Sequence, residues 1–281
     1  MKQEPRFKHN EWTLILGASS GFGGAAAVEL AKAGLNVFGV HLDRQATMAN
    51  VEQIIKDIKH AGREAVFYNI NAADAIKRTE TLEDIKERFA AASGHPTVKV
   101  LVHSLAFGTL KTFVAKRQED AISQAQMEMT IDVMANSLVY WAQGLIVRGL
   151  MKKGGRIFGM TSSGGHTVIP SYGAVSAAKA ALESHIRQLA MECGPLGITA
   201  NALMAGVTDT PALRKIPGNA DMLKVARAKN PAGRLTTPDD VARAIMLLSD
   251  DAAQWISGCT IGVDGGEDVV SFVGQKGHHH E

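Results

Sequence analysis

The stretch Trp12-Thr-Leu-Ile-Leu-Gly17-Ala-Ser-Ser-Gly21-Phe-Gly23 decides the fold. Its apolar start predicts a buried strand over residues 12–16, and its glycines predict a tight turn into a helix over about 23–33. Glycines let the backbone approach a pyrophosphate, while a helix N-terminus offers free N–H groups and a positive dipole end. The G-x-x-x-G-x-G spacing at the first strand–helix turn favours a dinucleotide site over a purely structural turn. The predicted contacts are Gly17, Ser19, Ser20, Gly21, Phe22 and Gly23.

Strand-like and helical segments alternate along the rest of the chain, which predicts βαβ units. We expect the α/β class: a single Rossmann-type doubly wound parallel sheet with helices on both faces, in one domain over residues 1–281. Further strands are predicted at 37–42, 65–70, 98–103, 156–160, 198–203 and 260–263. Helices are predicted at 46–60, up to about 92, in a long region up to about 151, up to about 193, and at 239–248.

Composition excludes several classes of function. The chain of 281 residues is 46% hydrophobic, carries a net charge of +2, and gives no reason to expect nucleic acid as a partner. It has no apolar run of about 18 residues and no secretory signal, so we expect a cytoplasmic protein outside the membrane. Cys193 and Cys259 lack neighbours at metal-ligand spacing, so we expect no metal and two buried thiols. His278 to His280 indicate a frayed tail or a tag remnant.

The segment Tyr172-Gly-Ala-Val-Ser-Ala-Ala-Lys179 indicates the reaction. On a helix with ~3.6 residues per turn, positions i and i+7 share a face two turns apart, farther than i and i+4. In reduction of an α,β-unsaturated thioester, hydride adds at C3 and negative charge appears on the C1 oxygen, two bonds away. A phenol placed farther along the helix suits that geometry as an oxyanion stabiliser. The spacing therefore favours enoyl reduction over carbonyl reduction.

The end of the second predicted strand lies where an adenine ribose would bind. His41 occupies the position where an acidic residue favours NAD, and Asp43 and Arg44 follow. Arg44 is suited to a fork on a 2′-phosphate, whereas Asp43 would repel that phosphate or bind a ribose hydroxyl. Both charges could equally be solvated in a loop. We expect NADPH, with NADH as the alternative. Other candidate cofactor contacts at strand ends are Asn69, Ile70, Ser104, Leu105 and Ala106.

Together with the ending Val263-Asp-Gly-Gly266, these motifs resemble the short-chain dehydrogenase/reductase family over nearly the whole chain. The Tyr-x6-Lys spacing and Val102-His-Ser-Leu-Ala-Phe107 resemble its enoyl-acyl-carrier-protein reductases. Asp209-Thr-Pro-Ala-Leu213 and Pro231-Ala-Gly-Arg234 resemble the NADPH-dependent, triclosan-tolerant branch. Two departures from carbonyl-reducing members agree with that branch. Met134 stands where many have Asn, and Val175 where a Tyr-x3-Lys enzyme has its phenol.

The resemblance implies roles for the matching residues. Tyr172 would hydrogen-bond the thioester oxygen, and Lys179 would hold the nicotinamide ribose hydroxyls. Ser162 matches the family serine, although some enoyl reductases have a second tyrosine there and neighbouring hydroxyls could simply cap the strand. The segment after the sixth strand would contact the nicotinamide carboxamide. Its candidates are Gly206, Val207, Thr208 and Thr210.

Residues 206–232 are predicted to form a lid over an acyl chain, the alternative being a plain pair of surface helices. The apolar residues expected to face inward are Leu213, Ile216, Met222 and Leu223. The same region holds Arg214, Lys215, Lys224, Arg227 and Lys229. These charges indicate either a solvated face or a docking patch for an acidic acyl carrier protein.

Three functions are consistent with these motifs. The first is reduction of a trans-2-enoyl thioester of acyl carrier protein or CoA by NAD(P)H in fatty acid synthesis. The second is a carbonyl or alcohol oxidoreductase acting on a small ketone or sugar. The third, a regulatory nucleotide-binding protein, is disfavoured because a pure binder has no need of the phenol.

Apolar residues on two helices also predict assembly. We expect a homotetramer: the family resemblance implies one interface on the long fourth helix and the helix after Lys179, and a second near the C-terminal strand. The apolar residues of these two helices are Leu138, Trp141, Leu145, Ala180, Ala181, Leu182, Leu189 and Ala190.

Overall fold

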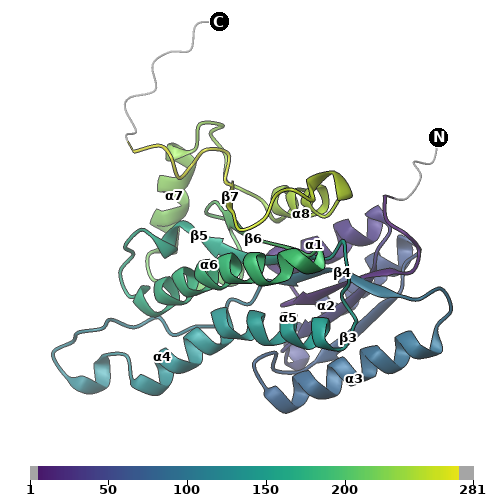
Figure 1. Ribbon diagram of the computed structural model, residues 1–281. Helices are drawn as coiled ribbons and strands as arrows, with labels where there is room; N and C mark the ends of the chain where they lie inside the picture. Colours follow the sequence, from purple (N-terminus) through teal and green to yellow (C-terminus); the bar gives the residue numbers. More distant parts are fainter. Residues whose placement is uncertain (1–5, 272–281) are drawn as a thin grey trace, which may run out of the picture.

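The computed structural model describes residues 6–271, which fold around a parallel sheet with the strand order β3-β2-β1-β4-β5-β6-β7 (Figure 1). Every neighbouring pair of strands is parallel. The order reverses beside β1, with β2 and β3 on one side and β4 to β7 on the other. The predicted doubly wound fold is therefore confirmed. The strands are β1 Glu11–Leu16, β2 Asn36–His41, β3 Ala65–Asn69, β4 Thr97–His103, β5 Arg156–Ser162, β6 Thr199–Ala205 and β7 Thr260–Val263.

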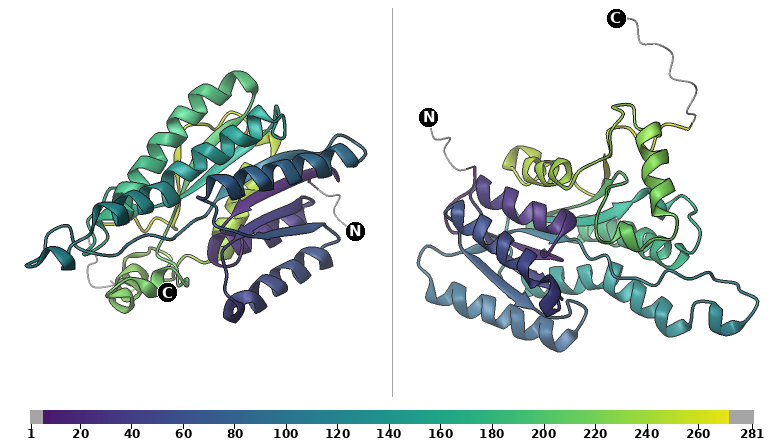
Figure 2. Two further views of the ribbon diagram at one scale, coloured as in Figure 1. Left: turned by 90° about the horizontal axis from the view of Figure 1, so that it is seen from below. Right: turned by 180° about the vertical axis from the view of Figure 1, so that it is seen from behind.

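Helices cover both faces of the sheet, as Figures 1 and 2 show. On one face, Leu14 and Leu16 of β1 join a buried cluster with α3, α5 and α6. On the other face, Ile15 joins a cluster with α1, α2 and α8. Strands buried on both sides read as continuous apolar runs, which explains the sequence pattern. The helices are α1 Gly21–Ala33, α2 Met48–His60, α3 Ala75–Ala91, α4 Gln124–Ile131, α5 Ser137–Val147, α6 Gly173–Cys193, α7 Asn219–Lys229 and α8 Pro238–Leu248.

The helical region expected after β4 begins later than the strand end suggests. An irregular loop follows β4, and α4 starts only where the Ser123 hydroxyl and the Gln126 side chain form a reciprocal capping box. A turn of π-helix over Asp132–Asn136 then joins α4 to α5. The loop packs closely on the helices, because a Cβ on Gly108 would lie 2.8 Å from Thr130 and 2.9 Å from Val175.

Two expectations drawn from composition and pattern change, and a third is not tested. Cys193 is buried, but Cys259, just before edge strand β7, is exposed. On α5, Leu138, Trp141 and Leu145 are fully buried against the sheet, so they cannot form an interface between subunits. The tail from His278 to His280 lies outside the described residues. Within residues 6–271, no helix has the length and apolar character needed to cross a membrane.

The turn from β1 to α1 leaves no room for a side chain at its first residue. Gly17 has φ +89°, and a Cβ there would lie 2.5 Å from the backbone carbonyl oxygen of Ser104. Gly62, after α2, has φ +74° but nothing within 4 Å of such a Cβ. Substitution of Gly62 would therefore cost only the strain of a left-handed backbone, whereas substitution of Gly17 would also cause a clash with the backbone of Ser104.

We expect Gly62→Ala to lower the free energy of unfolding by about 1–2 kcal/mol, the cost of left-handed geometry alone. Gly17→Ala should cost clearly more, because the Ser104 backbone must also move. Urea unfolding of both variants measures the difference. Equal losses in the two variants would contradict the close approach of β1 and β4.

Candidate active site

The predicted cofactor residues gather at the carboxyl ends of the parallel strands. A Cβ on Gly23 would lie 2.2 Å from the Gly17 carbonyl oxygen, so the turn closes tightly on itself. Ser20 is the N-cap of α1, yet its side chain makes no capping hydrogen bond. The first-turn N–H groups are thus not capped by that hydroxyl, and such groups are suited to bind phosphate oxygens. The loop therefore fits a dinucleotide pyrophosphate.

Two other predicted segments lie against this loop. Ser104 follows β4, and its backbone N–H donates to the Leu16 carbonyl at 2.8 Å. Thr210 follows β6 and is buried, and its methyl group would lie 3.7 Å from a Cβ on Gly21. The segments beginning at Ser104 and Gly206 are therefore brought to the two sides of the loop, with Leu105 and Ala106 continuing the first and Val207 and Thr208 the second.

The ends of β2 and β3 are joined by polar contacts. His41 and Asn69 are partners in the parallel register. The Asn69 side chain accepts from the Asp43 backbone N–H and donates to the Asp43 carbonyl, both at 3.0 Å. His41 Nδ1 lies 3.1 Å from the Asp43 carboxylate. Ile70 continues the contact, since its N–H donates to the His41 carbonyl at 2.8 Å.

This arrangement keeps the Asp43 carboxylate ionised. Burial opposes its ionisation, but hydrogen bonds from Thr47, Ser19 and His41 together hold its pKa below the usual value. Arg44 is exposed and forms no ion pair with any residue of the described range. The carboxylate is thus engaged with its own neighbours, while the adjacent guanidinium remains available to an anion.

Tyr172 and Ser162 lie next to each other, and both are close to Gly164. Tyr172 immediately precedes α6, rather than lying within it as the sequence suggested, and Ser171 before it has φ +61°. A Cβ on Gly164 would lie 2.6 Å from the Tyr172 ring and 3.3 Å from Ser162 Oγ, so this turn seats the ring beside the hydroxyl. Burial raises the pKa of Tyr172, and the nearby Ser162 hydroxyl opposes the shift. Ser162 Oγ is buried and forms no hydrogen bond of normal geometry with another described residue.

The Lys179 side chain on α6 is buried. Its ammonium donates to the Met160 carbonyl of β5 at 2.6 Å, which uses one of its three donors. Burial lowers the pKa of Lys179 to about 8, and the negative charge of Glu183 opposes this shift. The Glu183 carboxylate accepts a hydrogen bond from Thr161 Oγ1 at 2.7 Å. The charge of Lys179 therefore changes near pH 8.

His103 is a neighbour that the sequence motif contained without a role. It ends β4, is fully buried, and places Nε2 2.8 Å from Ser137 Oγ. Because the Ser137 hydroxyl donates to the Val133 carbonyl at 2.8 Å, it accepts the Nε2–H of the imidazole. Burial and the charge of Lys179 lower the pKa of His103 to about 3, so the ring is neutral. Its Nδ1 has no partner among the described residues.

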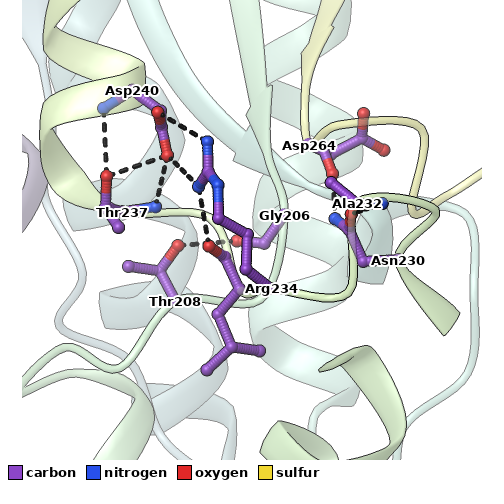
Figure 3. A network of polar contacts seen from close by, with 9 residues as sticks. Gly206, Thr208, Asn230, Ala232, Arg234, Thr237, Asp240 and Asp264 are labelled. Atoms are coloured by element: carbon purple, nitrogen blue, oxygen red, sulfur yellow. Dashed lines mark hydrogen bonds and ion pairs between the residues drawn. The ribbon is translucent and has the colours of Figure 1, made fainter. Parts of the chain in front are cut away.

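Figure 3 shows how the far end of the predicted lid is fixed. Asn230 donates to the Asp264 carbonyl at 2.7 Å, which ties the lid to the C-terminal segment. Arg234 forms a bidentate pair with Asp240 at 2.6 and 3.1 Å, at the start of α8. Between these anchors and β6, Leu213 and Ile216 are buried, whereas Met222 and Leu223, also expected to face inward, are only half-buried.

The C-terminal segment also reaches the start of the lid. Glu267 is buried, and its carboxylate oxygens both accept from the Val207 backbone N–H at 3.3 Å. Burial raises the pKa of this carboxyl. Neither Glu267 nor Glu183 was a sequence candidate. The i, i+4 spacing of Lys179 and Glu183 was a usable signal, whereas nothing local marked Glu267. No group of three His, Cys, Asp or Glu side chains within residues 6–271 is arranged to hold a metal.

Known proteins resemble this chain in sequence and in structure. A family profile described as Enoyl-(Acyl carrier protein) reductase matches residues 17–267. The 3-oxoacyl-(acyl-carrier-protein) reductase of Pseudomonas aeruginosa is 30% identical, over 90% of this chain and 95% of its own length. The 1-cyclohexenylcarbonyl-CoA reductase of Streptomyces collinus is 28% identical, over 96% of this chain and 91% of its own length.

A solved structure shares the fold. The enoyl-(acyl-carrier-protein) reductase of Anaplasma phagocytophilum, in complex with NAD, matches with a TM-score of 0.80 and 22% identity over 100% of both chains. The profile covers most of the sequence, and the Pseudomonas relative aligns over nearly all of it. The chain therefore belongs to the short-chain dehydrogenase/reductase family and is an oxidoreductase.

Proposed function

We propose that this protein reduces the C2–C3 double bond of a trans-2-enoyl thioester with NADPH. The observation that carries the proposal is the placement of its phenol. Of three tyrosines, Tyr68 bonds Asp84 and Tyr140 lies against Arg78, so Tyr172 alone stands beside Ser162. Val175, at the position of a Tyr-x3-Lys phenol, is buried at 5% exposure. The phenol that donates is thus Tyr172, just before α6 and three residues ahead of the Tyr-x3-Lys position. At that place an enolate oxygen, rather than a reacting carbonyl, would develop charge.

The side chains at the site have separable roles in this reaction. The bound nicotinamide cofactor would supply the hydride that C3 receives, and a proton from water would complete the reduction at C2. Tyr172, whose pKa is raised by burial, stays protonated and donates to the thioester oxygen as charge develops there. Lys179 has donors left for the nicotinamide ribose hydroxyls, and its positive charge favours the same anionic oxygen. Ser162 lies beside Tyr172, and its buried hydroxyl has no other partner among the described residues, so we assign it the role of orienting the phenol.

The alternative is a carbonyl or alcohol oxidoreductase, which the Pseudomonas relative, a 3-oxoacyl reductase by name, supports. The Streptomyces relative, named for an unsaturated CoA thioester, supports the enoyl proposal. Oxidation of NADPH, followed with crotonyl thioesters and with a panel of ketones, separates the two. Turnover of ketones alone would replace the enoyl proposal with the alternative.

Tyr172→Phe should lower kcat for an enoyl thioester by about 10²–10³, the usual cost of losing one oxyanion donor. Affinity for NADPH should change little, because the phenol donates to substrate. Steady-state kinetics and fluorescence titration measure the two effects. Tyr140→Phe is the matched control, since Tyr140 lies on α5 away from Ser162 and Lys179. Full turnover by the Tyr172 variant would remove this phenol from the mechanism.

Cofactor choice rests on Arg44 and Asp43. We propose NADPH, because the Asp43 carboxylate is engaged by His41 while Arg44 is exposed beside it. Arg44→Ala should therefore weaken NADPH far more than NADH, since only NADPH carries the 2′-phosphate that a guanidinium can clasp. Titration of both cofactors against wild type and variant tests this. A wild type that prefers NADH would show that Asp43 governs the pocket.

The acyl group is proposed to arrive on an acyl carrier protein, which docks at the lid. Lys224 and Arg227 are exposed on α7, whereas Arg214 is already paired with Asp209 at 2.7 Å. Leu213 and Ile216 lie beneath this surface and are buried, which suits a lid over an acyl chain. The basic patch for an acidic carrier is thus narrower than the sequence suggested, and CoA thioesters remain the alternative donors.

We also propose a homotetramer, through the two helices and the C-terminal edge expected from the sequence but without the buried residues Leu138, Trp141 and Leu145. A groove of about 230 Å³ lies between α5 and α6, lined by Val139, Tyr140, His185 and Leu189 among others. Met191 on α6 is 64% exposed, and Trp255, before edge strand β7, is 96% exposed. Exposed apolar residues on α6 and before β7 fit the interfaces of a tetramer with 222 symmetry.

Light scattering should give four times the chain mass of 29.9 kDa at micromolar concentration. Trp255→Lys should reduce the particle to a dimer, because it places a charge in the proposed second interface while leaving the helix interface intact. Met191→Lys probes the helix interface in the same way. A monomeric wild type would refute the assembly.

A further inference from the structure

Three consecutive residues of β5 hold the groups around Lys179. The Met160 carbonyl accepts from the ammonium at 2.6 Å, the Thr161 hydroxyl donates to Glu183 at 2.7 Å, and Ser162 lies beside Tyr172. Glu183 follows Lys179 by four residues on α6, so both side chains leave the same face of the helix. The strand therefore sets the positions of a cation, an anion and a hydroxyl at once.

The carboxylate of Glu183 acts on Lys179 without touching it. No ion pair within 4.0 Å joins the two, and Glu183 is held by Thr161 instead. The turn Ser163–Gly165 covers both, because a Cβ on Gly165 would lie 3.3 Å from Glu183 Oε1 and 3.4 Å from Lys179 Cβ. A charge pair shielded from water in this way interacts more strongly than one on the surface.

Other titratable groups near Lys179 contribute no opposite charge. His103 of β4 is neutral, since its pKa is lowered to about 3, and Tyr172 before α6 is a neutral phenol with a raised pKa. Burial lowers the pKa of Lys179 to about 8, and Glu183 is the charge that opposes this. Without that carboxylate, burial would act on the ammonium alone.

We propose that Glu183, anchored by the Thr161 hydroxyl, is a positioning residue that keeps Lys179 protonated and ready to bind the cofactor ribose. The inference rests on the proposed function for the role of Lys179 and adds the residue that maintains its charge. Thr161 holds Oε1 of Glu183, and no ion pair joins Glu183 to Lys179, so the ammonium keeps the donors that Met160 does not use.

The test is the pH dependence of NADPH affinity, measured by fluorescence without any acyl substrate. Wild type should lose affinity as pH rises through about 8, where Lys179 gives up its proton. Glu183→Gln keeps the shape and an acceptor for Thr161 but removes the charge. Its alkaline limb should therefore move about one pH unit lower, which is about a tenfold weaker affinity above the wild-type pKa.

Three further variants make the result specific. Glu183→Asp retains the charge and should restore most of the limb. Thr161→Val releases the carboxylate and should give a smaller shift in the same direction. Glu87→Gln, which removes an exposed glutamate of α3, should leave the limb unchanged. An alkaline limb in Glu183→Gln that coincides with wild type would overturn the inference.

The same profile keeps the two proposals apart. If wild type fails to reduce enoyl thioesters but the Glu183→Gln limb still moves, the enoyl function fails and the role of Glu183 stands. If enoyl reduction is observed and the limb does not move, the function stands and Glu183 has only a structural role. The pH profile of kcat/KM for NADPH should show the same displacement, because it reports the enzyme before the cofactor binds.

Discussion

The reversal of strand order between β1 and β4 is the constraint on which the site depends. Because the chain moves outward in opposite directions from these strands, their carboxyl ends bound a crevice that no crossover covers. Gly17 and Ser104 meet there so closely that a single methyl group would strike a backbone carbonyl. That contact places the glycine-rich loop, the segment after β4 and the first turn of α1 around one space.

Buried cations occur at both ends of this sheet and are handled differently. At the amino end, Lys99 pairs directly with Asp251 at 2.6 Å, and the buried Arg156 donates to the carbonyls of Gly154, Gly155 and Asp250. These two cations are held by several partners and serve the packing of the chain, although Arg156 Nε has no partner among the described residues. At the carboxyl end, Lys179 has one carbonyl partner and a carboxylate held at a distance. An ammonium with spare donors and a pKa near the working pH suits a site that must bind and release a ligand.

The described C-terminal segment packs against the stretch that joins β6 to α8. Glu267 accepts from the Val207 N–H, and Asn230 donates to the Asp264 carbonyl, so one short stretch contacts both ends of the lid. Position 206 must be a glycine for this packing, because a Cβ on Gly206 would lie 2.4 Å from Thr236 Oγ1 and 3.0 Å from Glu267. The lid is therefore anchored at its ends, and its buried residues Leu213 and Ile216 lie between the anchors.

The sequence by itself determined the parallel sheet, the glycine-rich turn and the order of the residues around the crevice. These depend on local signals: apolar runs of strand length, glycines at a strand end and the spacing of Tyr172 and Lys179. The start of α4 follows from a local capping box of Ser123 and Gln126, whereas the position of Tyr172 just before α6 is seen only in the structure. Which face of α5 is buried likewise depends on the sheet beneath it. The contacts of His103, Glu183 and Glu267 were decided only by the tertiary structure, since each brings a titratable group to a partner from another element through burial, which no local pattern encodes.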